Sequence, residues 1–161
     1  MSIRILLSLM ALSAVVTIAP QSADAETPMT GPEDPQAKTD VGPVDKDLPH
    51  QWEETPEGLR YRILREGDGD RPTASDTVSA HYKGWLDDET IFDSSYRRGQ
   101  PTSFPLNRVI PGWTIGLQKV AEGGMIELDI PSDLGYGSRG APGAVPPNAR
   151  LHFLVELKDV Q

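Results

Sequence analysis

Beyond residue 56, four stretches alternate between apolar and polar residues, which is the period of a half-buried β-strand. They are residues 59–64, 77–86, 125–130 and 151–157. In the longest stretch, Val78 and Tyr82 share the apolar set, and His81 belongs to the opposite set. We expect the apolar sets to face a core, with His81 and His152 pointing outward. Residues 90–93 are expected to be extended as well.

A single stretch has the period of an amphipathic helix. Pro111 and Gly112 begin it, apolar residues recur from Trp113 to Ala121 with helical spacing, and Gly123 follows as a stop. Several alternating strands with one helix predict an α+β domain, an antiparallel sheet curled around that helix. We expect this domain to span residues 56–161.

Residues 1–25 have the features of a secretory signal peptide. Arg4 precedes an apolar run over residues 5–19, and Ala23 and Ala25 form an A-x-A cleavage pattern. The alternative is an uncleaved membrane anchor, but the run is shorter than the ~20 residues that a bilayer span prefers. We therefore expect a periplasmic or secreted protein that has no membrane contact after cleavage.

Residues 26–55 are acidic and rich in proline, with eight acids against two lysines and five prolines. Their apolar residues follow no period, so the stretch is expected to be a disordered or extended arm. The alternative is an arm that docks on a partner. Its apolar contacts would be Val41, Val44, Leu48 and Trp52.

Composition excludes several classes of function. The net charge of −9 comes mostly from residues 26–55 and argues against a nucleic-acid binder. The absence of cysteine rules out disulfides and thiolate chemistry, and the three histidines lack metal-ligand spacing.

Residues 135–140 match the dinucleotide-binding motif G-x-G-x-x-G, but the prolines that follow prevent the helix that such a site needs. We expect no metal and no cofactor.

Several aromatic and apolar residues and one acid lie in short motifs near the ends of the expected strands and helix. They fall in five motifs, VSAHYKG at 78–84, FDSS at 92–95, VIPGW at 109–113, LGYG at 134–137 and ARLHF at 149–153. In order and spacing these motifs resemble the FKBP-type peptidyl-prolyl isomerases over about the last hundred residues. The signal peptide makes the chain look like a bacterial exported member. The family fold is a five- or six-stranded antiparallel sheet wrapped around one short helix.

The resemblance implies catalysed cis/trans rotation about X-Pro bonds, which needs no covalent nucleophile. By position, Asp93, Tyr136 and Tyr82 would be the catalytic residues, with Arg98 helping to hold Asp93. The residues that would bind the substrate proline are Phe92, Val109, Ile110, Trp113, Phe153 and Phe104. The expected partners are proline-containing, unfolded or partly folded exported polypeptides, with a role in assisting their folding.

The chain departs from the family pattern at the pocket edge. Thr102 stands where well-known members carry an aromatic wall, and Ala141 and Ala144 stand where bulkier residues often occur. These changes bear on affinity for rapamycin-like macrolide inhibitors, which the resemblance also implies. The alternative function is a chaperone-like module that holds proline-containing segments with little catalysis.

Overall fold

An antiparallel β-sheet forms the body of the protein, which is seen here in a computed structural model that describes residues 30–161. The expected signal peptide, residues 1–25, lies outside the described residues. The strands are β1 (Glu53–Glu54), β2 (Arg60–Arg65), β3 (Thr77–Trp85), β4 (Ile91–Ser94), β5 (Thr102–Pro105), β6 (Met125–Ile130) and β7 (Leu151–Val160). Their order is β1-β2-β6-β7-β3-β4, and β5 also pairs with β3.

β4 and β5 share one edge of β3. β4 pairs with the end of β3 that contains Gly84, and β5 pairs with the beginning of β3, from Thr77 to Ala80. The chain leaves the sheet between these two strands, so residues 95–101 connect them as an excursion from the edge. The predicted antiparallel sheet around one short helix is confirmed, and β1 and β5 are short strands that the alternation did not predict.

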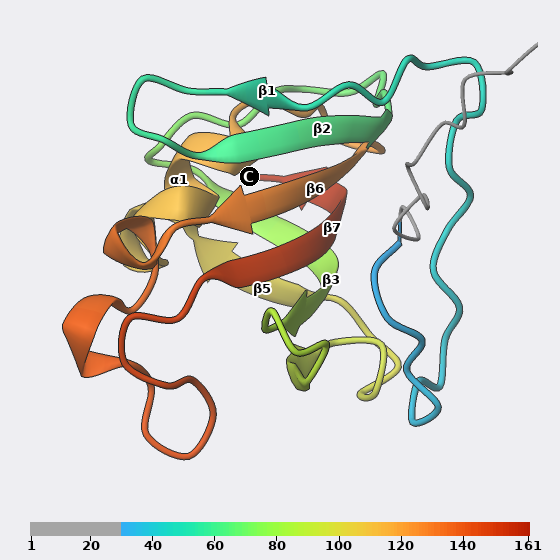
Figure 1. Cartoon of the computed structure of the whole chain (residues 1–161). Coiled ribbons are helices and arrows are strands. Elements are labelled where there is room, and N and C mark those ends of the chain that lie inside the picture. The colour runs from blue at the N-terminus through green and yellow to red at the C-terminus, as the bar shows by residue number, and fades with distance from the viewer. Residues whose placement is uncertain (1–29) are drawn as a thin grey trace, which may run out of the picture.

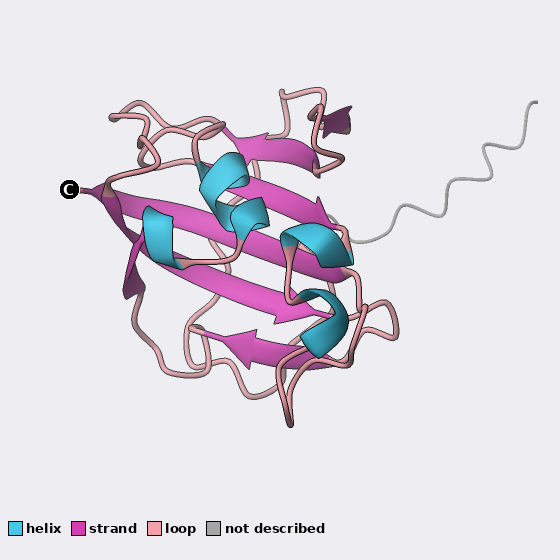
Figure 2. Cartoon of the chain, turned by 90° about the vertical axis from the view of Figure 1, so that its left-hand side faces the viewer, coloured by secondary structure: helices cyan, strands magenta, loops and turns pink. Residues whose placement is uncertain are grey.

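The helix α1 (Pro111–Leu117) and three 3-10 turns cover one face of the sheet (Figures 1 and 2). The turns are η1 (Leu106–Arg108), η2 (Ser132–Leu134) and η3 (Gly137–Arg139). Within residues 30–161, no helix is long and apolar enough to cross a bilayer.

The helix begins at Pro111 as predicted but ends earlier than the apolar period, which continues to Ala121. Gly112 and Gly116 lie against the sheet, where a Cβ on either would come within 2.6 Å of a β6 side chain. These glycines allow α1 to pack closely on the strands, but glycine is a poor helix former. Close packing on the sheet is therefore gained with residues that lower the intrinsic helix propensity of α1.

The main core lies between α1 and the inner face of the sheet, and the predicted alternation is confirmed there. Its fully buried members include Ile126, Leu128 and Ile130 from β6, and Val155 and Leu157 from β7. Tyr82, Trp113 and Phe153 lie at one end of this core with 4–5% of their surface exposed. This end opens into the cavity described below.

The arm, defined here as residues 30–52, lies along the opposite face of the sheet (Figure 1). It contains no helix or strand, and β1 follows it directly by pairing with β2. Val41 and Val44 pack against a second apolar cluster on this outer face. The cluster consists of Leu64, Trp85, Met125 and Leu154.

The arm changes the environment of the outward-facing residues. His81 and Lys83 point away from the main core, as the alternation predicts, but they are only 7% and 4% exposed. Every residue of β6 is buried, although Glu127 and Asp129 belong to its outward set. Lys83 is covered by the arm, where its Nζ donates to the Pro32 carbonyl, whereas Glu127 and Asp129 are paired with arginines of the domain. The alternation of one strand gives the direction of its side chains but carries no information about what covers them.

Candidate functional site

A cavity of about 270 Å³ opens at the end of the core where α1 begins. Its lining comes from β3, β4, β5, β7, α1 and the loops next to them. The lining residues are Tyr82, Phe92, Asp93, Phe104, Arg108, Val109, Ile110, Trp113, Tyr136 and Phe153. All nine site residues expected from the sequence thus meet at one cavity, and Arg108 is added to them.

Trp113 forms the floor of the cavity. It lies in the first turn of α1 and is 4% exposed, and its indole ring makes edge-to-face contacts with Tyr82, Phe104 and Phe153. Each of these ring centroids lies 5.3 Å from that of Trp113. Among the described residues, no group accepts a hydrogen bond from the buried Trp113 Nε1. The floor of the cavity and the rings around it thus present mostly aromatic surface.

The walls are aromatic as well. Phe92 of β4 meets Phe153 of β7 edge to face, with 5.5 Å between ring centroids. Both rings lie over Gly84, whose missing side chain leaves them room, since a Cβ there would lie 2.6 Å from Phe153 and 2.7 Å from Phe92. Strand β3 thus supplies the wall residue Tyr82 and, two positions later, the space for the facing wall.

Polar groups are confined to the rim. The Tyr82 hydroxyl donates a 2.6 Å hydrogen bond to Oδ2 of Asp93, the contact that the resemblance implies. Arg98 donates to Oδ1 of Asp93 at 2.9 Å and, through a second nitrogen, to the Tyr82 hydroxyl oxygen at 2.6 Å. The carboxylate of Asp93 is therefore held at two oxygens while its side chain stays 45% exposed to the cavity mouth.

The rim tyrosines remain protonated donors at neutral pH. Burial raises the pKa of Tyr82 to about 12, and the hydrogen bond to Asp93 acts in the same direction. Burial also raises the pKa of Tyr136, with a smaller contribution from the charge of Asp93. The hydrogen bond to Asp93 raises the pKa of Arg98, so this side chain stays charged.

Tyr136 stands just before η3 and is 39% exposed. Its position between two 3-10 turns puts an aromatic ring and a hydroxyl at the open side of the cavity. A large aromatic residue this exposed is unusual for a side chain that only packs. It is well placed to contact a bound molecule.

Arg108 is the lining residue that the sequence reasoning missed. It lies in the 3-10 turn η1 directly before Val109, where neither strand nor helix periodicity applies. Thr102 and Ala141, the departures from the family pattern, are outside the lining set, and Thr102 instead lies 3.4 Å from an Arg98 nitrogen. Residues 30–161 hold no group of three metal-ligating side chains.

Sequence comparison identifies the relatives of the chain. The family described as "FKBP-type peptidyl-prolyl cis-trans isomerase" matches residues 69–158, more than half of the chain. The isomerase FkpA of Escherichia coli K12 is 53% identical over 104 residues, and Mip of Coxiella burnetii is 46% identical over 104 residues. These alignments cover 65% of this chain but only 38% of FkpA and 45% of Mip. The chain thus spans less than half the length of these relatives.

Solved structures agree with the sequence relatives. The crystal structure of FkpA from Escherichia coli superposes with a TM-score of 0.67 at 47% identity, covering 71% of this chain and 53% of that one. The crystal structure of AtFKBP13 gives a TM-score of 0.64 at 32% identity, covering 69% of this chain and 99% of that one. The shared part is the domain that contains the cavity.

Proposed function

The chain belongs to the FKBP-type peptidyl-prolyl cis-trans isomerase family, and we propose that its cavity catalyses rotation about the peptide bond that precedes a proline. The observation that carries this proposal is the meeting of all nine expected site residues at one apolar cavity. Its volume of about 270 Å³ suits a proline ring and the groups next to it.

An apolar cavity lowers the barrier through the polarity of the amide. Uncatalysed rotation meets a barrier of about 18–20 kcal/mol, because the amide resonance must be broken. The planar ground state is more charge-separated than the twisted transition state, so a water-excluding site stabilises the transition state relative to it. The aromatic side chains that surround Trp113 support this role, and the substrate proline would lie on the indole of Trp113.

The rim holds the substrate while the bond turns. The Tyr136 hydroxyl donates to a substrate carbonyl, and the Ile110 backbone N–H donates to a second one. Asp93 lies next to the rotating carbonyl, in an orientation that Tyr82 and Arg98 fix. Because fixed groups cost no reorganisation during the reaction, this geometry favours the transition state.

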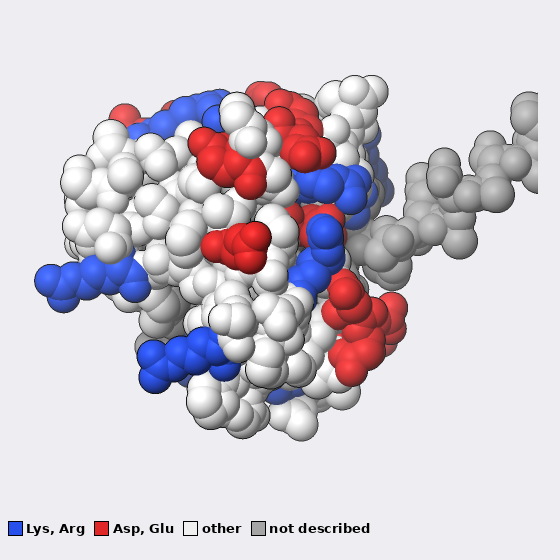
Figure 3. Space-filling view, turned by 60° about the vertical axis from the view of Figure 1, so that its left-hand side comes forward, with Lys and Arg blue, Asp and Glu red and all other residues white. Residues whose placement is uncertain are grey.

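The substrates are proline-containing segments of unfolded or partly folded exported polypeptides. Proline isomerisation takes tens of seconds without a catalyst and limits the folding of many chains. The expected signal peptide places the protein in the periplasm or outside the cell, where it assists folding. Figure 3 shows a face of the domain on which residues other than Lys, Arg, Asp and Glu make up most of the surface, with separate basic and acidic side chains around it.

A protease-coupled assay with a proline-containing peptide tests the activity. The purified chain is expected to accelerate the cis-to-trans step, and rapamycin is expected to inhibit it by occupying the same cavity. Binding of the peptide with an isomerisation rate at background would contradict the enzymatic function and favour a holding chaperone.

A further inference from the structure

The turn formed by residues 95–99 contacts both the arm and the polar rim of the cavity. It begins where β4 ends and belongs to the excursion between β4 and β5. Hydrogen bonds from Arg98 N and Gly99 N to Ser95 O, both 3.0 Å, close the turn. Its residues Tyr96 and Arg97 contact the arm, and its next residue, Arg98, holds Asp93 and Tyr82.

The arm holds this turn through polar contacts, one of which comes from a buried carboxylate. The Asp34 carboxylate, whose side chain is 4% exposed, accepts from Arg97 Nε with both oxygens, at 2.9 and 3.0 Å. The Lys38 N–H donates to the Tyr96 carbonyl at 2.9 Å. One side-chain and one backbone contact therefore fix two successive residues of the turn.

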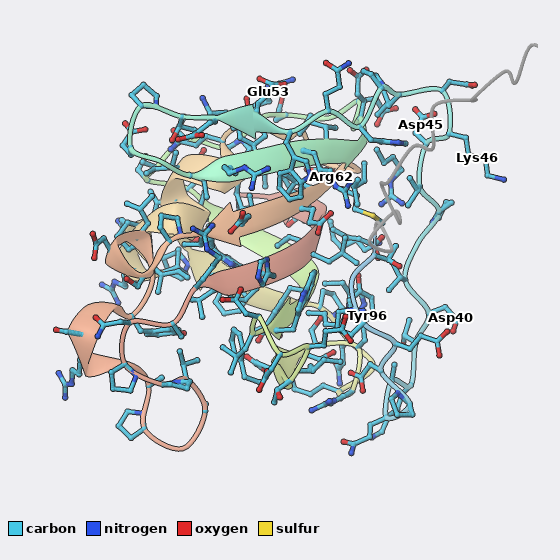
Figure 4. The ribbon with its side chains drawn as sticks, in the orientation of Figure 1. Asp40, Asp45, Lys46, Glu53, Arg62 and Tyr96 are labelled. Atoms are coloured by element: carbon cyan, nitrogen blue, oxygen red, sulfur yellow. The ribbon has the colours of Figure 1, made fainter. Side chains whose placement is uncertain are left out.

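A buried carboxylate of the sheet ties the turn and the arm together. Tyr96 is 1% exposed, and its hydroxyl donates to Oε1 of Glu156 at 2.7 Å. The same oxygen accepts from the Gly42 N–H of the arm at 2.9 Å. Figure 4 shows the Tyr96 side chain beside the arm, whereas Asp40 projects away from the domain.

Arg98 is much more exposed than Asp34, Tyr96 and Glu156. Its side chain is 45% exposed, long and flexible, and such a side chain loses considerable rotamer freedom when it is held in one geometry. Its guanidinium nonetheless bonds both Asp93 and Tyr82. A backbone fixed at Tyr96 and Arg97 reduces the freedom that Arg98 must lose.

We propose that the arm is a positioning element of the active site, in which Asp34 holds the 95–99 turn through Arg97 so that Arg98 presents Asp93 and Tyr82 to the substrate. This inference rests on the proposed isomerase function. In this proposal the acidic arm acts on the cavity from the face of the sheet opposite α1. Loss of the contact between Asp34 and Arg97 leaves the Arg98 side chain free to move, and Asp93 and Tyr82 are then no longer held in a fixed orientation.

The first test compares Asp34→Asn and Arg97→Gln with Asp40→Asn, which makes the same charge change at an exposed arm position. Assays run well below the unfolding temperature of every variant, which is measured alongside. We expect kcat/KM to fall about three- to tenfold for Asp34→Asn and Arg97→Gln, because small displacements of positioned groups are costly. Asp40→Asn is expected to stay within twofold. Equal kcat/KM in all three folded variants would overturn the proposal.

A double-mutant cycle separates positioning from a general structural effect. If Asp34 acts through Arg98, Asp34→Asn lowers kcat/KM in the unaltered chain but causes no further loss in an Arg98→Gln background. The same fold-loss in both backgrounds would refute the coupling. Asp34→Glu keeps the charge and is expected to restore part of the rate.

The Arg98 guanidinium provides a readout that does not depend on activity. In NMR spectra of the purified chain, its side-chain N–H resonances are expected to be resolved and protected from water exchange, and Asp34→Asn is expected to broaden them. An unaltered chain without isomerase activity would contradict the proposed function, whereas unchanged Arg98 resonances in Asp34→Asn would contradict only the positioning role.

Discussion

The Tyr82 hydroxyl and the Asp93 carboxylate are joined by a 2.6 Å hydrogen bond at the mouth of an otherwise aromatic cavity. Arg98 bonds the second oxygen of Asp93 and the oxygen of Tyr82 as well, so the three groups form a closed set. Such a set acts as a unit, and its members are not expected to contribute independently.

The first prediction concerns this pair. Tyr82→Phe and Asp93→Asn are each expected to lower kcat/KM about tenfold, the value of a hydrogen bond to a charged group. The kcat/KM of the double variant is expected to be only slightly lower than that of the less active single variant. Peptide isomerisation measured for the four proteins provides the cycle, and strictly multiplicative losses would show that the pair does not act together.

Tyr136 provides a second prediction because it is 39% exposed and contributes little to the core. Tyr136→Phe removes only the hydroxyl, so kcat/KM is expected to fall about fivefold, the effect of one lost hydrogen bond, without a change in melting temperature. Tyr61→Phe is the matched control, because its hydroxyl bonds Glu53 at 2.7 Å on β1, away from the cavity. Equal rates for Tyr136→Phe and the unaltered chain would remove Tyr136 from the site.

Gly84 connects packing with function. Gly84→Ala places a methyl group within 2.7 Å of the Phe92 and Phe153 rings, and such overpacking costs about 1–3 kcal/mol. We expect both a lower melting temperature and a lower kcat/KM, because the displaced rings are cavity walls. Gly58→Ala is the control, because its methyl would meet nothing within 4 Å and its φ of 88° lowers stability through backbone strain alone, so its kcat/KM is expected to stay normal. A normal rate in folded Gly84→Ala would show that the wall geometry is not required.

Glu156 predicts how stability depends on pH. Burial opposes its ionisation, but hydrogen bonds from one backbone and three side-chain donors outweigh burial and lower its pKa from 4.5 to about 2. The folded state therefore favours the ionised carboxylate. This preference adds about 3 kcal/mol to the free energy of unfolding above pH 4.5, and the contribution is lost as the pH falls toward 2.

Urea unfolding at pH 7, 4.5 and 3 measures this contribution. The unaltered chain is expected to lose stability between pH 4.5 and 3, and Glu156→Gln is expected to be less stable at pH 7 and to show a smaller loss. Identical pH dependence of the two proteins would contradict the role of Glu156 as the buried anchor of the arm.

The sequence predicted the elements that are set by local periodicity. Alternation located β2, β3, β6 and β7, and Pro111 marked the start of α1 correctly. It missed β5, because Thr102–Pro105 is short and ends in proline. The end of α1 was also missed, because the apolar period continues to Val120 and Ala121, which are buried in the turn that follows the helix.

The site and the arm differed in how far they could be predicted. The resemblance identified nine residues that the structure brings to one cavity, while Arg108 lay in a turn without a periodic signal. The burial of Lys83 could not be predicted, because the arm that covers it lies distant in sequence and follows no pattern. Contacts such as Gly42 to Glu156, across 114 residues, depend on the assembled fold.

The most direct test of the central claim is exchange NMR on an unmodified proline-containing peptide with the purified chain at catalytic concentration and no protease present. We predict exchange peaks between the cis and trans forms on a timescale far shorter than the tens of seconds of the uncatalysed reaction. These exchange peaks are expected to weaken in Asp93→Asn. Exchange that stays at the uncatalysed rate with the folded, unaltered chain would contradict the account.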